Sequence, residues 1–174
     1  MLEDFNLLVS TRRGEENAAC SELWYLLKEI GDPEPLTDIT PVKGLIVAKT
    51  SLDPFEVVKR LRSFLEEKPE EFQYTLKITP IQKVVKTRIE DIREVAKQLA
   101  KNIAAEEKFR VTVEKRHTEL DRMEIIKVVA EEIDRKVDLK NPDKILLIEI
   151  IGNLTGISVL KPSDIFSIVK EKHI

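Results

Sequence analysis

The sequence contains few of the residues on which enzymes most often depend. Of its 174 residues, one is Cys and two are His. A single Cys excludes both a disulfide framework and a Cys-rich zinc site. The five Gly residues do not have the spacing of a glycine-rich phosphate-binding loop. Cys20 falls within an expected helix, where core packing is the usual role of a free thiol. We therefore expect no catalysis by this chain alone, no metal and no cofactor.

The sequence also lacks long apolar runs and is poor in aromatic residues. No stretch of about 18 apolar residues occurs, so no membrane partner is expected. Acidic residues precede the first apolar run, unlike a signal peptide, which predicts a cytoplasmic protein. Aromatic residues make up 5% of the chain, which disfavours a binder that stacks several single-stranded bases. Recognition of folded RNA by its shape and backbone stays open.

Charge is distributed unevenly along the chain, whose formal net charge is −3. Residues 1–74 hold 9 Lys and Arg against 15 Asp and Glu, a net charge of −6. Residues 75–122 hold 12 against 8, a net charge of +4, and residues 123–174 hold 8 against 9. A basic middle in an acidic chain indicates a local site for a polyanion, although chance variation of a solvated surface would look the same.

Residues 1–80 are predicted to form a first domain. Short apolar segments typical of strands alternate with segments of helical spacing. Asp53 precedes Pro54 and is expected to cap the second helix. The order is β-α-β-β-α-β, that of a ferredoxin-like domain with helices on one face of an antiparallel sheet. The expected strands cover residues 5–10, 36–40, 44–50 and 72–78, and the expected helices cover residues 15–30 and 53–65.

Residues 81–174 are predicted to form a second, α/β domain, which makes the whole chain α+β. Thr87 and Glu90 have the spacing of a capping box at a helix start. A strand, a crossover helix and a nearly continuous apolar strand imply a parallel pair. Gly152 and Asn153 form a hairpin turn signal. The expected strands cover residues 109–115, 145–151 and 154–160, the helices cover residues 87–103 and 121–135, and a short last helix starts at Pro162.

Basic residues of this second half are candidates for binding phosphate groups. The densest cluster, residues 115–118, ends a strand and precedes a helix, and phosphates are bound by Lys, Arg, hydroxyls and N–H groups at helix starts. Parallel pairing predicts Arg116, His117 and Lys161 near one end of the sheet and Lys140 and Lys144 near the other. For each residue taken alone, an ordinary solvent-exposed charge is a simpler interpretation than a phosphate-binding role. The candidate RNA-binding residues are Lys83, Lys86, Arg88, Arg110, Lys115, Arg116, His117, Arg122, Lys140, Lys144 and Lys161.

Four pieces of this half, taken in order, resemble a THUMP domain, a tRNA-binding module. They are Thr87–Ile92, the strand and turn Phe109–His117, the Val-Asp-Leu-Lys-Asn-Pro-Asp piece at 137–143, and Ile148–Gly152. The resemblance covers residues 81–169, and THUMP domains typically follow a small ferredoxin-like domain. It implies binding roles for residues 110, 115–117, 122, 140 and 144.

The linking segment Thr79–Thr87 is similar to that of the stand-alone tRNA N4-acetylcytidine adaptor family. That resemblance implies a non-catalytic adaptor. It would bind folded tRNA, often at the acceptor end, and present it to a separate modification enzyme, a tRNA cytidine N4-acetyltransferase. No DNA partner is expected.

Two alternatives remain open at the level of sequence. The chain could be a cryptic RNA-modifying enzyme that uses His117. It could also be a regulatory module whose ferredoxin-like half binds a protein or small molecule, which would suit the acidic first domain. On the adaptor hypothesis, changing both Lys115 and Arg116 to Glu should weaken tRNA binding more than about tenfold without lowering the melting temperature.

Overall fold

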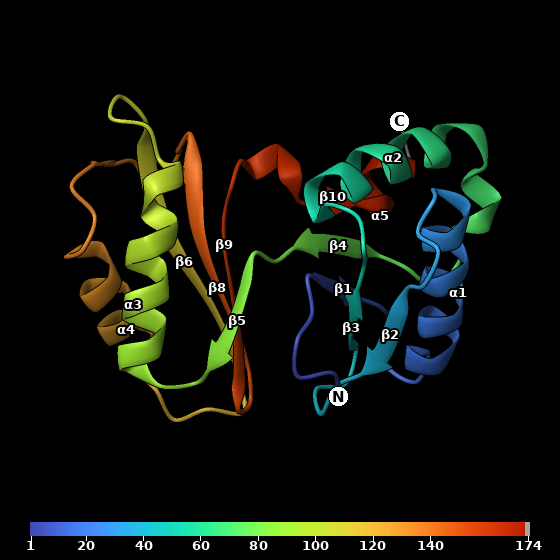
Figure 1. The fold of residues 1–174 in the computed structure, drawn as a ribbon, viewed down its shortest axis with the longest axis horizontal. Coiled ribbons are helices and arrows are strands. Elements are labelled where there is room, and N and C mark those ends of the chain that lie inside the picture. The colour runs from blue at the N-terminus through green and yellow to red at the C-terminus, as the bar shows by residue number, and fades with distance from the viewer. Residues whose placement is uncertain (173–174) are drawn as a thin grey trace. The chain divides into compact units, whose positions relative to one another are not determined.

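The computed structural model describes residues 1–172 and divides into two compact units. The first unit comprises residues 1–81 together with the described residues from Ser163 onward, and the second comprises Gln82–Pro162. Each unit has its own five-stranded sheet and its own apolar core (Figure 1). The expected α+β class is confirmed.

The first unit is built on an antiparallel sheet with the strand order β10-β4-β1-β3-β2. Apolar side chains of β1 and β3 pack against apolar side chains of α1 and α2, so both helices lie on the same face. The elements are β1 (Leu7–Ser10), α1 (Glu16–Glu29), β2 (Leu36–Ile39), β3 (Leu45–Lys49), α2 (Pro54–Glu67), the 3-10 turn η1 (Pro69–Glu71), β4 (Lys77–Pro80), β10 (Phe166–Ser167) and α5 (Ile168–Lys172).

Side-chain carboxylates determine the local structure at two places in this unit. The Asp53 carboxylate accepts hydrogen bonds from the N–H groups of Phe55 and Glu56, which confirms the expected N-cap of α2. The strand expected over 72–78 is wrong for most of its length, since β4 begins at Lys77. The N–H groups of residues 73–75 donate instead to the carboxylate of Glu22 on α1, so they are unavailable to a strand ladder.

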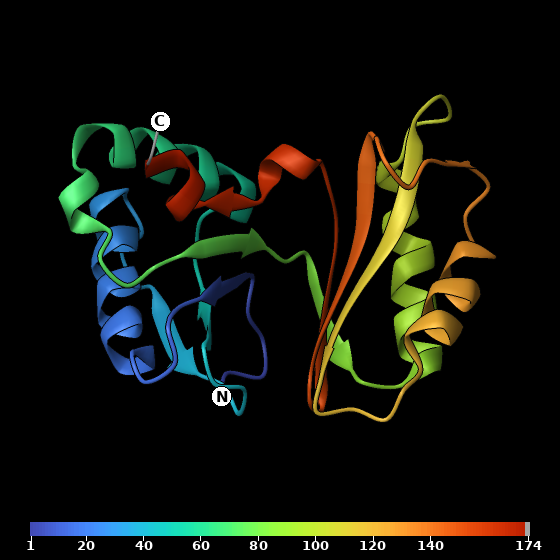
Figure 2. The same cartoon turned by 180° about the vertical axis from the view of Figure 1, so that it is seen from behind.

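The second unit has the strand order β5-β9-β8-β6-β7. β8 pairs in parallel with β6 and antiparallel with β9. Helices α3 and α4 cover one face of this sheet, where their apolar residues share a core with β6, β8 and β9 (Figure 2). The elements are β5 (Lys83–Lys86), α3 (Ile89–Leu99), the 3-10 turn η2 (Ala100–Asn102), β6 (Lys108–Arg116), α4 (Arg122–Ala130), β7 (Lys136–Val137), β8 (Lys144–Ile151), β9 (Leu154–Leu160) and the 3-10 turn η3 (Pro162–Asp164), which crosses the boundary between the units.

The start of α3 differs from the expected capping box. Arg88 is the N-cap residue, and its side chain makes no capping hydrogen bond to this helix. The Thr87 hydroxyl instead lies 2.9 Å from the hydroxyl of Thr155 on β9. The Thr87 side chain, which the local pattern predicted as part of a capping box, therefore contacts β9 instead of capping α3. Helix α4 is also shorter than expected and ends at Ala130.

The chain returns to the first unit after β9. Residues 163–172 were expected within the second domain, but β10 pairs with β4 through Phe166 and Ile78. The reason is apolar burial: Phe166 is fully buried in the first core and meets Phe72 edge to face, at 6.4 Å between ring centroids. The chain first passes from the first unit to the second between residues 81 and 82, one residue from the expected boundary between residues 80 and 81. No helix within residues 1–172 is long and apolar enough to cross a membrane.

We predict that Phe166→Ala lowers the free energy of unfolding of the first unit by about 3–5 kcal/mol, because it leaves a cavity in a packed core. Urea titration followed by fluorescence of Trp24, the single Trp, reports on this unit. The control is Val169→Ala in the same segment, where the side chain is exposed and a change within about 0.5 kcal/mol is expected. Equal effects of the two substitutions would contradict the assignment of Phe166 to the first core.

Candidate nucleic-acid interface

Two opposite edges of the second sheet carry most of the candidate residues. Because β6 and β8 are parallel, with Arg116 opposite Ile151, their last residues meet at one edge. The hairpin turn at 152–153 and the end of β5 lie at the same edge, since Lys86 pairs with Leu154. We call this the carboxyl edge. The amino edge holds the first residues of β6 and β8 and the end of β9.

The carboxyl edge brings together six of the eleven candidates. The connections from β5 to α3 and from β6 to α4 both leave the sheet here (Figure 2). The candidates at this edge are Lys86, Arg88, Lys115, Arg116, His117 and Arg122.

The other five candidates lie elsewhere on the sheet. Arg110, Lys140, Lys144 and Lys161 lie at or next to the amino edge, while Lys83 pairs with Ile157, the midpoint of β9. The expected placement of Lys161 beside Arg116 and His117 is wrong. Strand β9 runs antiparallel to β8, so its last residue, Leu160, returns opposite Ile145 at the start of β8.

Backbone hydrogen bonds fix the carboxyl edge. The Gly152 N–H donates to the Arg116 carbonyl, and the Thr87 N–H donates to the Asn153 carbonyl, both at 2.9 Å. His117 follows β6 with a φ of 57°, in the left-handed region that non-Gly residues rarely adopt. These constraints define the position at which the chain leaves β6 toward α4.

Both helices of the unit start at this edge, so the positive ends of two helix dipoles lie there. At α4 the Asp121 carboxylate accepts a hydrogen bond from the Glu124 N–H. At α3 the N-cap residue Arg88 makes no side-chain capping hydrogen bond, and no other side chain of residues 1–172 accepts from the first N–H groups. Those donors are available to an external anion, which is how helix starts bind phosphate.

The cations of the carboxyl edge fall into two groups. Arg116 Nη1 donates to Glu149 Oε1 at 2.5 Å, and the Glu149 side chain is 5% exposed. Lys115 Nζ donates to the Leu120 carbonyl at 2.9 Å. The remaining side chains are exposed and make no hydrogen bond or ion pair within residues 1–172: Lys86, Arg88, His117 and Arg122. The charges of Lys86, Arg88 and Arg122 and the ring nitrogens of His117 are therefore available for a ligand.

The amino edge is more fully neutralised. Lys144 Nζ donates to Glu107 Oε1 and to the Asn102 carbonyl, both at 2.9 Å. A backbone N–H bond from Ala104 and the Lys144 ammonium together hold the pKa of Glu107 below its usual value. Arg110 Nη1 donates to the Leu139 carbonyl at 2.9 Å. Lys140 is exposed. Each edge thus has one ion pair among its candidate residues, Arg116 with Glu149 at the carboxyl edge and Lys144 with Glu107 at the amino edge.

Sequence reasoning missed the residue that holds Arg116. Glu149 is the single charge within the apolar run 145–151, and it stands on a central strand. A charge in such a position usually has a partner, because burial of an unpaired carboxylate is costly. That pattern was the available signal. In the described part of the chain, no group of three or more His, Cys, Asp and Glu side chains could hold a metal ion.

Comparison with known families gives the identity of this unit. The family model described as THUMP domain matches residues 86–160. The second unit contains a THUMP domain. The match includes Arg88, His117 and Arg122, and it confirms the family to which these residues were related by their motifs.

Similar proteins are longer than this chain. An uncharacterized protein of Schizosaccharomyces pombe is 28% identical over 157 residues, covering 84% of this chain and 54% of its own length. The crystal structure of PH1313 from Pyrococcus horikoshii Ot3 has a TM-score of 0.64 at 24% identity, covering 91% of this chain and 55% of that one. This chain therefore spans about half the length of these two proteins.

Two further solved structures share the fold at lower identity. TrmN from Thermus thermophilus has a TM-score of 0.59 at 16% identity, covering 88% of this chain and 44% of its own. A 4-thiouridine synthetase in complex with RNA and ATP has a TM-score of 0.54 at 14% identity, covering 91% and 42%. At these identities the likeness concerns the fold of the THUMP domain and the unit before it.

We predict that Arg116→Gln lowers the free energy of unfolding by about 2–4 kcal/mol, because the Glu149 carboxylate stays buried without its cation. The structure thus changes the expectation that replacing Lys115 and Arg116 leaves the melting temperature intact. Chemical denaturation of the full chain measures the loss. The double variant with Glu149→Gln should regain much of it, and Arg88→Gln should change stability by less than about 0.5 kcal/mol. Equal stability of the two single variants would argue against the pair.

Proposed function

We propose that this chain is a non-catalytic adaptor that binds folded tRNA through the carboxyl edge of its THUMP domain. The observation that carries the proposal is that four exposed basic side chains without a partner in residues 1–172 lie at the edge where α3 and α4 start, and that the N-cap residue of α3 makes no side-chain capping hydrogen bond. They are Lys86, Arg88, His117 and Arg122. Phosphate oxygens are the ligands that such donors bind best.

Electrostatics favour a phosphate-rich ligand at this edge over the amino edge. Exposed cations without internal partners break no ion pair when they bind a phosphate. Each such contact also releases counterions from the nucleic acid. Lys144 would first have to leave Glu107. Binding of a related fold to RNA in the 4-thiouridine synthetase complex supports the same ligand class. Few aromatic side chains are present, so shape and backbone recognition suit this chain better than base stacking.

We assign the first unit to the ferredoxin-like class, in support of the adaptor arrangement. The elements from β1 to β4 have the order β-α-β-β-α-β, their four strands lie in the order β4-β1-β3-β2, and α1 and α2 lie on one face. The partner we propose is a separate tRNA cytidine N4-acetyltransferase. The support is the similarity of residues 79–87 to the stand-alone adaptors and the absence of a catalytic motif in the sequence.

The first experiment measures RNA binding. We expect tRNA to bind more tightly than a duplex of equal length, with an acceptor-stem minihelix as a third ligand. We also expect affinity to fall steeply between about 50 and 200 mM salt. The Arg88→Glu and Arg122→Glu double variant should bind tRNA at least about tenfold more weakly, because two phosphate contacts are reversed.

The matched control changes the same charge on the same unit. Lys97 and Lys127 are exposed in the last turns of α3 and α4. Their replacement by Glu should change the dissociation constant for tRNA by less than about threefold at a constant melting temperature. If the two double variants bind tRNA equally, the carboxyl edge is not the binding surface.

A second experiment tests the adaptor role. Purified chain incubated with tRNA and acetyl-coenzyme A should leave the nucleosides unchanged, as measured by mass spectrometry of the digested RNA. Addition of the chain to the acetyltransferase of the same organism should raise the yield of N4-acetylcytidine, and the Arg88→Glu and Arg122→Glu variant should not. Nucleoside modification by the chain alone would contradict the proposal and favour the enzyme hypothesis.

A further inference from the structure

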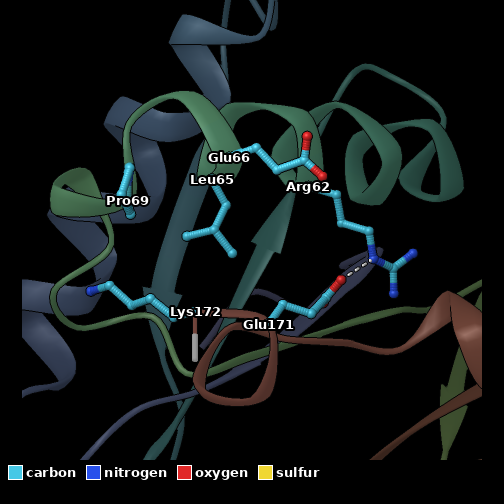
Figure 3. Close-up of a pocket in the computed structure, with 6 residues that line it drawn as sticks. All are labelled: Arg62, Leu65, Glu66, Pro69, Glu171 and Lys172. Carbon is cyan, nitrogen blue, oxygen red and sulfur yellow. Dashed lines mark hydrogen bonds and ion pairs between the residues drawn. The ribbon is translucent and has the colours of Figure 1, made fainter. Parts of the chain in front are cut away.

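A cavity of about 330 Å³ lies in the first unit between α2, η1 and α5. Leu65 and Pro69 give it apolar surface, and the charged residues Arg62, Glu66, Glu171 and Lys172 complete the lining. Figure 3 shows Leu65 directed from α2 toward α5, with Glu171 and Lys172 on the opposite wall. The RNA-binding proposal uses none of these residues.

The far wall of the cavity depends on a single arginine. Arg62 Nε donates to Glu171 Oε1 at 2.9 Å, and Nη2 donates to the carbonyls of Ser163 and Ile165. The guanidinium also lies over the Phe166 ring, 5.3 Å from its centroid. Arg62 therefore holds the returning segment against α2, and its Nε and Nη2 donors are already used. The wall is preorganised rather than available to bind an anion.

The rim of the cavity is acidic. Residues 66–71 include four Glu with a single Lys, at position 68. Glu66, Glu67 and Glu70 are exposed and make no ion pair within residues 1–172, while Glu71 accepts a hydrogen bond from the Tyr25 hydroxyl. Residues 1–74 carry a net charge of −6, so the wider surface reinforces this potential. Such a rim repels nucleic acid and attracts a cationic partner.

We propose that this cavity and its acidic rim are the docking surface for a Lys- and Arg-bearing segment of the RNA-modifying enzyme. The inference rests on the adaptor function proposed above. An enzyme that acts on tRNA needs cationic surface of its own, because phosphate contacts dominate RNA affinity. Charge complementarity with Glu66, Glu67 and Glu70 steers that surface to the first unit, and the apolar floor of Leu65 and Pro69 accepts a small apolar side chain beside the cations.

The experiment compares two charge-matched double variants of the full chain in binding to the purified acetyltransferase. The test variant carries Glu66→Lys and Glu70→Lys at the rim. The control carries Glu3→Lys and Glu34→Lys, which are exposed acidic positions outside the cavity lining. We expect the test variant to bind the enzyme at least about tenfold more weakly and the control to bind within about threefold of the unchanged chain. Affinity of both variants for tRNA should stay within about threefold.

A further variant tests the cavity without changing charge. Pro69→Trp places a bulky ring in the cavity lining and should also weaken enzyme binding, with the melting temperature as a check on folding. Equal binding of the enzyme to the rim variant and the unchanged chain overturns the docking surface and leaves the adaptor function intact. Failure of the unchanged chain to bind the enzyme overturns both. A loss of tRNA affinity in the rim variant, with enzyme binding unchanged, would assign the surface to RNA instead.

Discussion

The pairing of β8 with both of its neighbours determines where the charged side chains of the THUMP domain lie. Parallel pairing with β6 brings Arg116 and Ile151 to one edge, and antiparallel pairing with β9 returns the chain to the other. The connections to α3 and α4 leave from the first of these edges, so two helix starts and the Gly152 turn gather there. Strand register thus produces a cationic edge from residues that are up to 36 positions apart, from Lys86 to Arg122.

A basic side chain at that edge can bind a ligand readily only where it has no ion pair within the chain. Arg116 is held by the buried Glu149, while Arg88 and Arg122 are exposed and unpaired within residues 1–172. A buried pair contributes rigidity and position, because breaking it would leave an uncompensated charge. Exposed cations contribute attraction, which falls with salt. The basic cluster recognised in the sequence therefore separates into residues that shape the edge and residues that can meet a ligand.

The first unit shows the same division between acidic residues with and without internal partners. Glu22 accepts the N–H groups that would otherwise extend β4, and Glu171 fixes Arg62 at the cavity wall. Glu66, Glu67 and Glu70 have no such partner in the described residues. The adaptor proposal assigns the acidic surface of the first unit to the enzyme and the basic edge of the second unit to RNA.

The sequence by itself determined the α+β class, the helical and strand periodicities, the Asp53 cap and the THUMP motifs, because these depend on neighbours within a few residues. It also identified the basic candidates, since their types and approximate order are local facts. Only the tertiary structure decided that Lys161 lies at the amino edge and that Thr87 contacts Thr155. It also decided that Arg116 forms an ion pair with Glu149 and that Phe166 packs in the first core. Each of these depends on strand pairing or burial between residues distant in sequence, and neither is encoded in local spacing.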